Sequence, residues 1–208
     1  MAKVCGLTRA AEVPMVLAAG ADLVGFLQHP ASPRHCPDPG LARLAGARAV
    51  LVVVAGQLEP ILDWLGQCPA QWVQPYLPAA ERPRALARLR ARGVRVLLPW
   101  PDEPGQEPLP ADLYLWETSH AQTGRLGGSG QGHAMRHPPP GPYLLAGGLS
   151  GPVLAERFAA LKEPVRAACR GFDAASRLEA GGPGKDRSRV IDFVTAAHCL
   201  PPHFRSSP

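Results

Sequence analysis

Short apolar segments alternate along the chain with amphipathic segments of helical period. Val4 and Cys5 end the first apolar segment, and seven more follow at residues 22–27, 49–54, 71–73, 94–98, 112–116, 143–146 and within 165–172. Strands that are apolar on both faces are typical of a parallel sheet covered by helices. Eight of them in 208 residues predict a single-domain (β/α)8 barrel, with a doubly wound open sheet as the alternative.

Helical segments are expected between most of these strands. They are predicted at residues 8–19, 39–45, 59–66, 81–92, 151–161 and 185–197, with Thr8 as the N-cap of the first. The helical period weakens after Pro99, so the helix after the fifth strand is expected to be short or missing. Glycine, histidine and proline dominate residues 124–142 and predict an irregular connection after the sixth strand. The barrel is expected to span residues 1–198, followed by a flexible tail at 199–208.

The amino-acid composition favours some classes of binding partner and disfavours others. The net charge of +5 suits an anionic ligand, but the arginines are scattered along presumed helices rather than gathered with aromatic residues. This distribution disfavours nucleic acid and favours a small phosphorylated substrate. No apolar run is long enough for a membrane span or resembles a signal peptide. The five cysteines form no C-x-x-C pair, so reduced thiols in the cytoplasm are expected.

Three reactive side chains follow or end predicted strands. Cys5, Glu117 and Asp173 close the first, sixth and eighth strands. A barrel gathers such residues at the carboxyl ends of its strands, where active sites lie. A thiolate and a carboxyl group facing each other across a substrate suit a proton-shuffling isomerisation. Taken singly, Glu117 also fits a solvated loop acid and Cys5 a small buried apolar residue.

Two glycine-rich segments follow late strands. They are residues 127–130 and 146–149, and they place Gly128, Gly130, Gly147 and Gly148 where backbone N–H groups can approach a phosphate. Flexible turns are the other explanation for either segment alone. Metal ligation is disfavoured, because the histidine clusters lack a ligand motif; they are His133 with His137, and His29 and His35 with Cys36. Ser129 has no nucleophile-elbow motif around it.

Seven short blocks, spread over nearly the whole chain, resemble the phosphoribosylanthranilate isomerase family of tryptophan biosynthesis. They are residues 3–9 (KVCGLTR), 20–26 (GADLVGF), 32–34 (SPR), 127–130 (GGSG), 144–149 (LLAGGL), 171–173 (GFD) and 183–186 (PGKD). The resemblance implies a (β/α)8 barrel that performs an Amadori rearrangement without metal or cofactor. It allows a monomer or a homodimer.

The resemblance also assigns roles by position. Cys5 is implied to be the general base at ribose C2, and Glu117, where the family has aspartate, the general acid at the ring oxygen. Arg34 and Asp173 are implied to hold the anthranilate portion. Phosphate is implied to bind backbone around Gly128 and Gly130, around Gly147 and Gly148, and in the loop that contains Ser176 and Arg177.

The chain departs from the family pattern at four places. Besides Glu117, Tyr76 stands at a position of histidine, residues 133–135 replace Phe-Asp-Trp, and Arg177 replaces a glycine. Arg177 either blocks close approach of phosphate to the backbone or supplies a cation to it. An active isomerase is the leading hypothesis, and the alternative is a divergent barrel that binds a ligand or acts on another phosphosugar.

Overall fold

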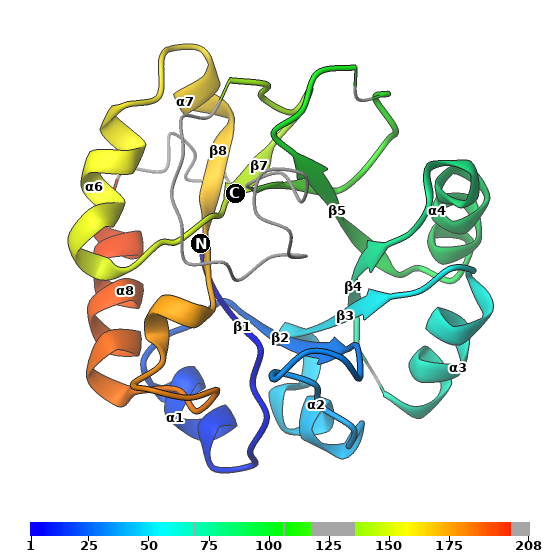
Figure 1. Cartoon of the computed structure of the whole chain (residues 1–208), viewed down its shortest axis with the longest axis horizontal. Helices are drawn as coiled ribbons and strands as arrows, with labels where there is room; N and C mark the ends of the chain where they lie inside the picture. The colour runs from blue at the N-terminus through cyan, green and yellow to red at the C-terminus, as the bar shows by residue number, and fades with distance from the viewer. Residues whose placement is uncertain (69, 106, 118–135, 201–208) are drawn as a thin grey trace, which may run out of the picture.

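The computed structural model describes residues 1–68, 70–105, 107–117 and 136–200. Its eight strands form a closed, parallel barrel in chain order (Figure 1). The strands are β1 (Ala2–Cys5), β2 (Leu23–Gln28), β3 (Ala49–Val54), β4 (Trp72–Tyr76), β5 (Arg95–Pro101), β6 (Leu113–Glu117), β7 (Tyr143–Leu145) and β8 (Cys169–Ala174). The predicted barrel is confirmed, and the open sheet is wrong because β8 pairs with β1.

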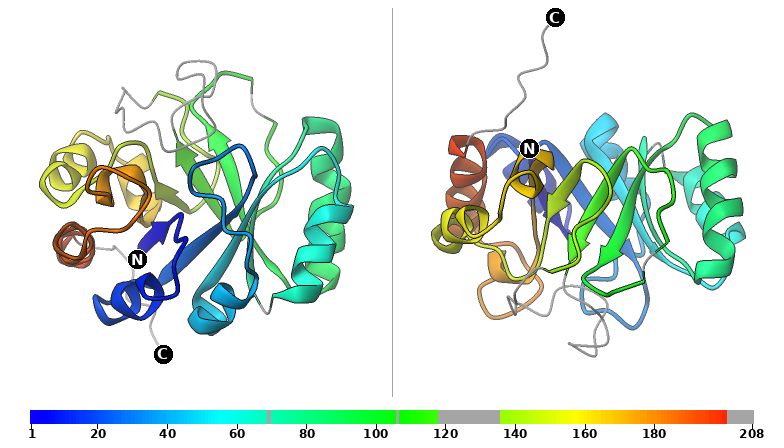
Figure 2. Two further views of the ribbon diagram at one scale, coloured as in Figure 1. Left: turned by 60° about the horizontal axis from the view of Figure 1, so that its bottom comes forward. Right: turned by 90° about the horizontal axis from the view of Figure 1, so that it is seen from above.

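Helices lie outside the strands (Figures 1 and 2). They are α1 (Glu12–Ala18), α2 (Gly40–Ala45), α3 (Glu59–Gln67), α4 (Arg82–Ala91), α6 (Gly151–Ala159), α7 (Val165–Ala168) and α8 (Arg187–Cys199), with short 3-10 turns η1 (Gly46–Arg48), η2 (Ala79–Glu81) and η3 (Ser176–Leu178). The described residues between β5 and β6 contain no helix, as the weak period after Pro99 predicted. No helix in the described part of the chain is long and apolar enough to cross a membrane.

Strand residues alternate between two apolar layers, which explains why the strands read as continuous apolar runs. In β3, Val50 and Val52 pack inside the barrel, whereas Leu51 and Val53 pack against the helices. The interior layer is filled by side chains, so the barrel is a packed core rather than a pore. Its buried members are Leu23, Val50, Val52, Trp72, Leu97, Leu113, Leu115, Leu144 and Ala146.

Three local predictions are wrong, and the first is the end of β5, which reaches Pro101 instead of the predicted residue 98. β4 extends to Tyr76, beyond the predicted 71–73, because Pro75 removes only one ladder hydrogen bond and its φ suits an extended backbone. Thr8 is not a helix cap, since α1 begins at Glu12. The buried Glu12 carboxylate accepts hydrogen bonds from the backbone N–H groups of Thr8 at 2.8 Å and Lys185 at 2.7 Å. Glu12 thereby ties the loop after β1 to the loop after β8.

The end of the chain and the connection after β6 are described only in part. α8 ends at Cys199, and most of the predicted tail, residues 201–208, lies outside the described residues. The same holds for residues 118–135, which include Gly128 and Gly130. Residues 136–142, before β7, have no helix or strand.

Candidate active site

The carboxyl ends of the parallel strands carry the reactive side chains to one end of the barrel. Cys5 ends β1, Tyr76 ends β4, Glu117 ends β6, and Asp173 lies near the end of β8. Tyr76 is close enough to Cys5, Glu117 and Asp173 for each of their charges to act on its hydroxyl. The three residues predicted to face one bowl therefore lie at the same end of the barrel, near a tyrosine that the sequence did not single out as a site residue.

A buried ion pair forms the floor of this site. Lys3 is fully buried, and its Nζ lies 2.6 Å from Oδ1 of Asp173. Burial by itself lowers the pKa of Lys3, but the Asp173 carboxylate and the nearby Cys5 outweigh it, so the pKa is raised and the lysine stays charged. Lys3 precedes Cys5 by two positions in β1, which puts both side chains on the interior face. The site therefore holds a fixed cation beside the thiol.

Cys5 is partly exposed at the barrel mouth, and Gly25 of the paired strand makes room for it. A Cβ at Gly25 would lie 2.6 Å from the Cys5 sulfur, too close for any other residue. Burial raises the pKa of the Cys5 thiol; Lys3 and Lys185 oppose that rise, and Asp173 adds to it. The thiol form therefore predominates at neutral pH, and the lysines favour the thiolate that a general base requires.

Glu117 is a protonated acid at neutral pH. Its side chain is buried, and Oε2 accepts a hydrogen bond from the Tyr76 hydroxyl at 2.9 Å. Burial raises the pKa of Glu117 to about 8; the Tyr76 hydrogen bond and Lys3 oppose the rise, and Asp173 adds to it. A carboxyl group with this pKa holds its proton until a developing oxyanion takes it.

Arg34 reaches the mouth over the loop after β1. Its side chain lies against Gly6, where a Cβ would be 2.7 Å from Cδ of Arg34 and φ is +78°. Nε and Nη2 of Arg34 donate to the two carboxylate oxygens of Glu179 at 2.7 and 2.9 Å, and Lys185 Nζ donates to Oε1 at 2.7 Å. Burial raises the pKa of Glu179, but the hydrogen bonds from Arg34 and Lys185 lower it by more. The net pKa of Glu179 therefore lies below its ordinary value. The ionised Glu179 thus fixes the guanidinium, whose Nη1 has no hydrogen bond to the described residues.

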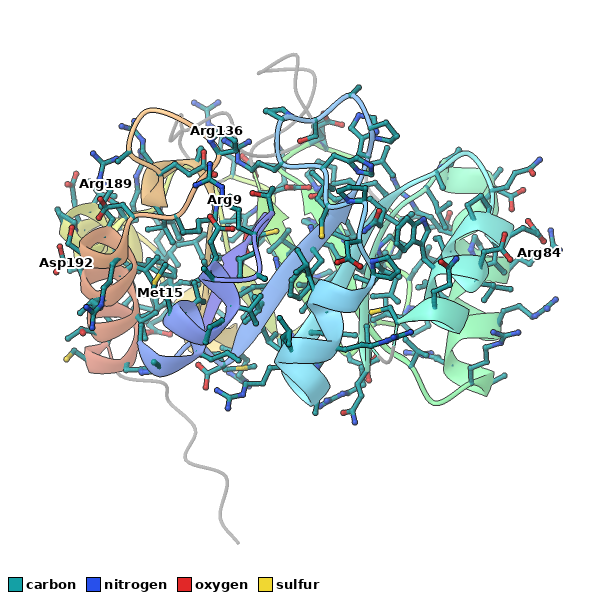
Figure 3. The ribbon with its side chains drawn as sticks, turned by 90° about the horizontal axis from the view of Figure 1, so that it is seen from below. Arg9, Met15, Arg84, Arg136, Arg189 and Asp192 are labelled. Carbon is teal, nitrogen blue, oxygen red and sulfur yellow. The ribbon has the colours of Figure 1, made fainter. Side chains whose placement is uncertain are left out.

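The loops after β7 and β8 are where phosphate binding is predicted. Gly147 and Gly148 have φ of +98° and +66°, a conformation that favours glycine, and they precede the N-terminus of α6. Ser176 and the exposed Arg177 lie in η3, directly after β8. Figure 3 shows Arg9 and Arg136 at this same end of the barrel. The described residues therefore bring glycine turns and positive charge together on the side predicted for phosphate.

The histidines considered as metal ligands either make structural hydrogen bonds or lie outside the described residues. His35 Nδ1 accepts a hydrogen bond from the backbone of His29, and the described residues contain no cluster suited to a metal. The backbone N–H of His137 donates to the buried Asp102 at 2.6 Å, which holds the chain before β7. His133 is not among the described residues.

Four residues of the candidate site were not predicted from the sequence: Lys3, Tyr76, Glu179 and Lys185. Lys3 and Tyr76 carried a detectable signal, because a lysine in an apolar strand two positions before Cys5, and a tyrosine at the carboxyl end of a strand, both face the barrel mouth. Glu179 and Lys185 lie in a loop, where side-chain direction does not follow from periodicity.

Similarity to known proteins assigns the chain to a family. No family model matches it. It is 30% identical to N-(5'-phosphoribosyl)anthranilate isomerase of Azorhizobium caulinodans, over 93% of this chain and 90% of that protein. The chain belongs to the N-(5'-phosphoribosyl)anthranilate isomerase family. A family protein of Beijerinckia indica subsp. indica is 31% identical over 95% of this chain and 93% of its own.

Solved structures of the family share this barrel. TrpF of Jonesia denitrificans superposes with a TM-score of 0.73 at 25% identity, over 95% of this chain and 96% of that one. A phosphoribosylanthranilate isomerase determined in complex with reduced 1-(o-carboxyphenylamino)-1-deoxyribulose 5-phosphate has a TM-score of 0.66 at 22% identity, covering 96% and 98% of the two chains. The (β/α)8 prediction and the family resemblance are both confirmed.

Proposed function

We propose that this family isomerase converts N-(5-phosphoribosyl)anthranilate to 1-(2-carboxyphenylamino)-1-deoxyribulose 5-phosphate with Cys5 and Glu117 as its acid–base pair. The observation that carries the proposal is the protonated Glu117 at the barrel mouth, in a site where Lys3 stands beside the Cys5 thiol. A donor that keeps its proton at neutral pH and a thiolate favoured by a fixed cation are the two groups that the rearrangement needs.

The steps follow from these protonation states. Glu117 gives its proton to the ribose ring oxygen, the bond from that oxygen to C1 breaks, and nitrogen supplies the electron pair for an iminium at C1. Cys5 thiolate removes the proton from C2, and the C2–H electrons form the enolamine while the iminium is neutralised. A proton then returns to C1 while the C2 hydroxyl loses its proton, which leaves a ketone at C2 and balances the proton taken by Cys5 against the one given by Glu117. The reaction is a redistribution of protons and electrons within one molecule, so no outside oxidant or reductant enters.

Substrate orientation is assigned to charged and glycine-rich parts of the site. Arg34, held by Glu179, presents Nη1 to the anthranilate carboxylate, and the family resemblance assigns Asp173 to the same part of the substrate. Phosphate is assigned to the loops after β7 and β8, to the backbone of Gly147 and Gly148 and to Ser176 and Arg177. Gly128 and Gly130 complete this set by sequence. Binding of both the carboxylate and the phosphate would hold the ribose near the acid and the base.

A direct assay tests the function. Freshly prepared N-(5-phosphoribosyl)anthranilate loses its anthranilate fluorescence as it isomerises, so turnover by the purified protein is followed continuously. Expression in a tryptophan auxotroph that lacks this step provides a second test, and we expect growth without tryptophan. Absence of turnover in a protein that still binds the reduced product analogue would contradict the proposal and support the divergent ligand-binding barrel.

The pH dependence of kcat/KM is expected to break near pH 8. Productive free enzyme has Cys5 ionised and Glu117 protonated. The pKa of Cys5 is raised above 9.0, mainly by burial, whereas that of Glu117 is about 8, in a site that Lys3, Asp173, Tyr76 and Lys185 also face. Below pH 8 the thiolate fraction, and with it kcat/KM, rises by about tenfold per pH unit. Above pH 8 the gain in thiolate is offset by the loss of protonated Glu117, so kcat/KM no longer changes with pH.

Fluorescence assays between pH 6.5 and 10 measure this profile. Glu117→Gln is the matched control, because without the acid the rise should continue past pH 8 until Cys5 is ionised. A wild-type profile that is already level between pH 6.5 and 8 would contradict the assigned protonation states.

Arg34→Lys is expected to raise KM by about 10- to 100-fold with little change in kcat, since a charged hydrogen bond contributes about 1.5–3 kcal/mol. Lysine keeps the charge but lacks the planar fork that lets Arg34 bind Glu179 and a carboxylate together. Steady-state kinetics measure the effect, with Arg84→Lys, which changes an exposed pair with Glu59, as the control. An unchanged KM would remove Arg34 from the anthranilate site.

Three broader expectations accompany the function. The five cysteines are all unpaired in the structure, which supports the predicted cytoplasmic location. Assembly as a monomer or a homodimer stays a prediction, as does the absence of a nucleic-acid partner.

A further inference from the structure

Two departures from the family pattern contact each other. Tyr76 stands where the family motif has histidine, and Glu117 stands where it has aspartate. Tyr76 belongs to β4 and Glu117 to β6, with β5 between them in the barrel. Their side chains nevertheless meet across the mouth, with the Tyr76 hydroxyl 2.9 Å from Oε2 of Glu117. The unusual acid therefore has an unusual partner.

The hydrogen bonds around this pair run in one direction. Gln74 lies two positions before Tyr76 on the same face of β4, and its Nε2 donates to the Tyr76 hydroxyl oxygen at 3.0 Å. The hydroxyl has a single proton, which it donates to Oε2 of Glu117. Oε2 is thus occupied as an acceptor, and the acidic proton of Glu117 belongs on Oε1.

Tyr76 remains a donor throughout the working pH range. Burial and then the charge of Glu117 raise the pKa of Tyr76 well above that of a free tyrosine. The other charged groups that face Glu117 are Lys3 of β1 and Asp173 of β8, and these two pair with each other at 2.6 Å. Among the described residues, Tyr76 alone makes a hydrogen bond to the Glu117 side chain.

We propose that Tyr76 is a positioning residue for the acid: its hydroxyl, oriented by Gln74, anchors Oε2 of Glu117 and leaves Oε1 to deliver the proton to the substrate. This role rests on the proposed function of Glu117. It explains how the additional methylene of glutamate is accommodated, because an unanchored longer side chain would sample rotamers that take the proton away from the ring oxygen.

Tyr76→Phe tests the role, because it removes the hydroxyl and keeps the buried ring. We expect kcat to fall by at least about tenfold and KM to stay within about twofold, since the lost interaction acts on proton transfer and not on binding. Tyr143→Phe is the matched control: that hydroxyl also is buried against protein, donating to the Val165 carbonyl at 3.0 Å, but it lies outside the site. The control should leave both constants unchanged.

A double-mutant cycle identifies the group through which Tyr76 acts. Glu117→Asp withdraws the carboxyl group by one methylene from the tyrosine. In that background, Tyr76→Phe should lower kcat by less than about twofold, because the contact is already lost. Equal costs of Tyr76→Phe in the two backgrounds would show that the tyrosine acts independently of Glu117 and would overturn the proposal, as would a wild-type kcat in Tyr76→Phe.

A measurement without substrate separates this proposal from the proposed function. Protein labelled with 13C at glutamate carboxyl groups reports the titration of Glu117, whose resonance is identified by its absence in Glu117→Gln. The Tyr76 hydrogen bond lowers the pKa of Glu117, so Tyr76→Phe should raise the observed midpoint above its wild-type value near 8. An unchanged midpoint would exclude the anchoring contact. A wild-type protein without turnover but with this shift would refute the proposed reaction and retain the contact.

Discussion

Cys5→Ala is expected to lower kcat by about a thousandfold, within the 10²- to 10⁴-fold range of a lost general base, and to change KM little. Alanine removes the thiolate that Lys3 and Lys185 favour, while the smaller side chain fits against Gly25 without a clash. Steady-state and single-turnover fluorescence measurements with N-(5-phosphoribosyl)anthranilate provide the test. A variant that keeps more than about a tenth of the wild-type kcat would exclude Cys5 as the base.

Cys199→Ala serves as the control for loss of a thiol. Cys199 is exposed at the end of helix α8, and it belongs to none of the strands that carry the site. The control should have wild-type kinetics. Equal losses of activity in the two variants would indicate a general effect on the protein instead of a catalytic role for Cys5.

Glu117→Gln is expected to lower kcat by about 10²- to 10⁴-fold, because the amide has nearly the same shape but cannot release a proton to the ring oxygen. Binding of the reduced product analogue should be retained. Kinetic and binding measurements on one preparation check both parts. Glu59→Gln, which changes an exposed glutamate paired with Arg84, is the control and should be fully active. Retention of activity by Glu117→Gln would exclude Glu117 as the acid.

The same variant has a stability signature with a definite sign. In the folded protein Glu117 has a pKa of about 8, against 4.5 for an ordinary glutamate in water. Between these values the folded state holds a proton that the unfolded state releases, so this group makes the free energy of unfolding fall as pH rises through that window. Denaturant unfolding of Glu117→Gln should therefore show a smaller decrease between pH 5 and about 8 than the wild type.

Much of the barrel was predictable because its strands are buried on both faces. β3 was predicted to the residue, since six consecutive apolar residues leave little choice of boundary. The predicted β4 ended at residue 73, before Pro75, and the start of α1 was misplaced by the expected Thr8 cap. Both errors come from local rules that tertiary contacts overrode, namely strand pairing around Pro75 and the hydrogen bonds of Glu12 to the loops after β1 and β8.

The site was predictable in position but not in detail. A parallel barrel brings the carboxyl ends of its strands together, so Cys5, Glu117 and Asp173 could be placed at one end from the order of the strands alone. Which side chains contact each other depends on strand tilt and register around the barrel. The contact from Tyr76 to Glu117 across β5, and the fixing of Arg34 by Glu179, therefore had no signature in the sequence.

The sequence by itself determined the strand order, the (β/α)8 architecture, the family and the residue types available for acid–base chemistry. These properties depend on apolar periodicity and on motifs that are local in the chain. The tertiary structure alone decided the protonation states and partners, because the pKa of a thiol or carboxyl group depends on burial and on charges that distant strands bring near it. Burial makes Glu117 an acid at neutral pH, and only the closed barrel supplies that burial.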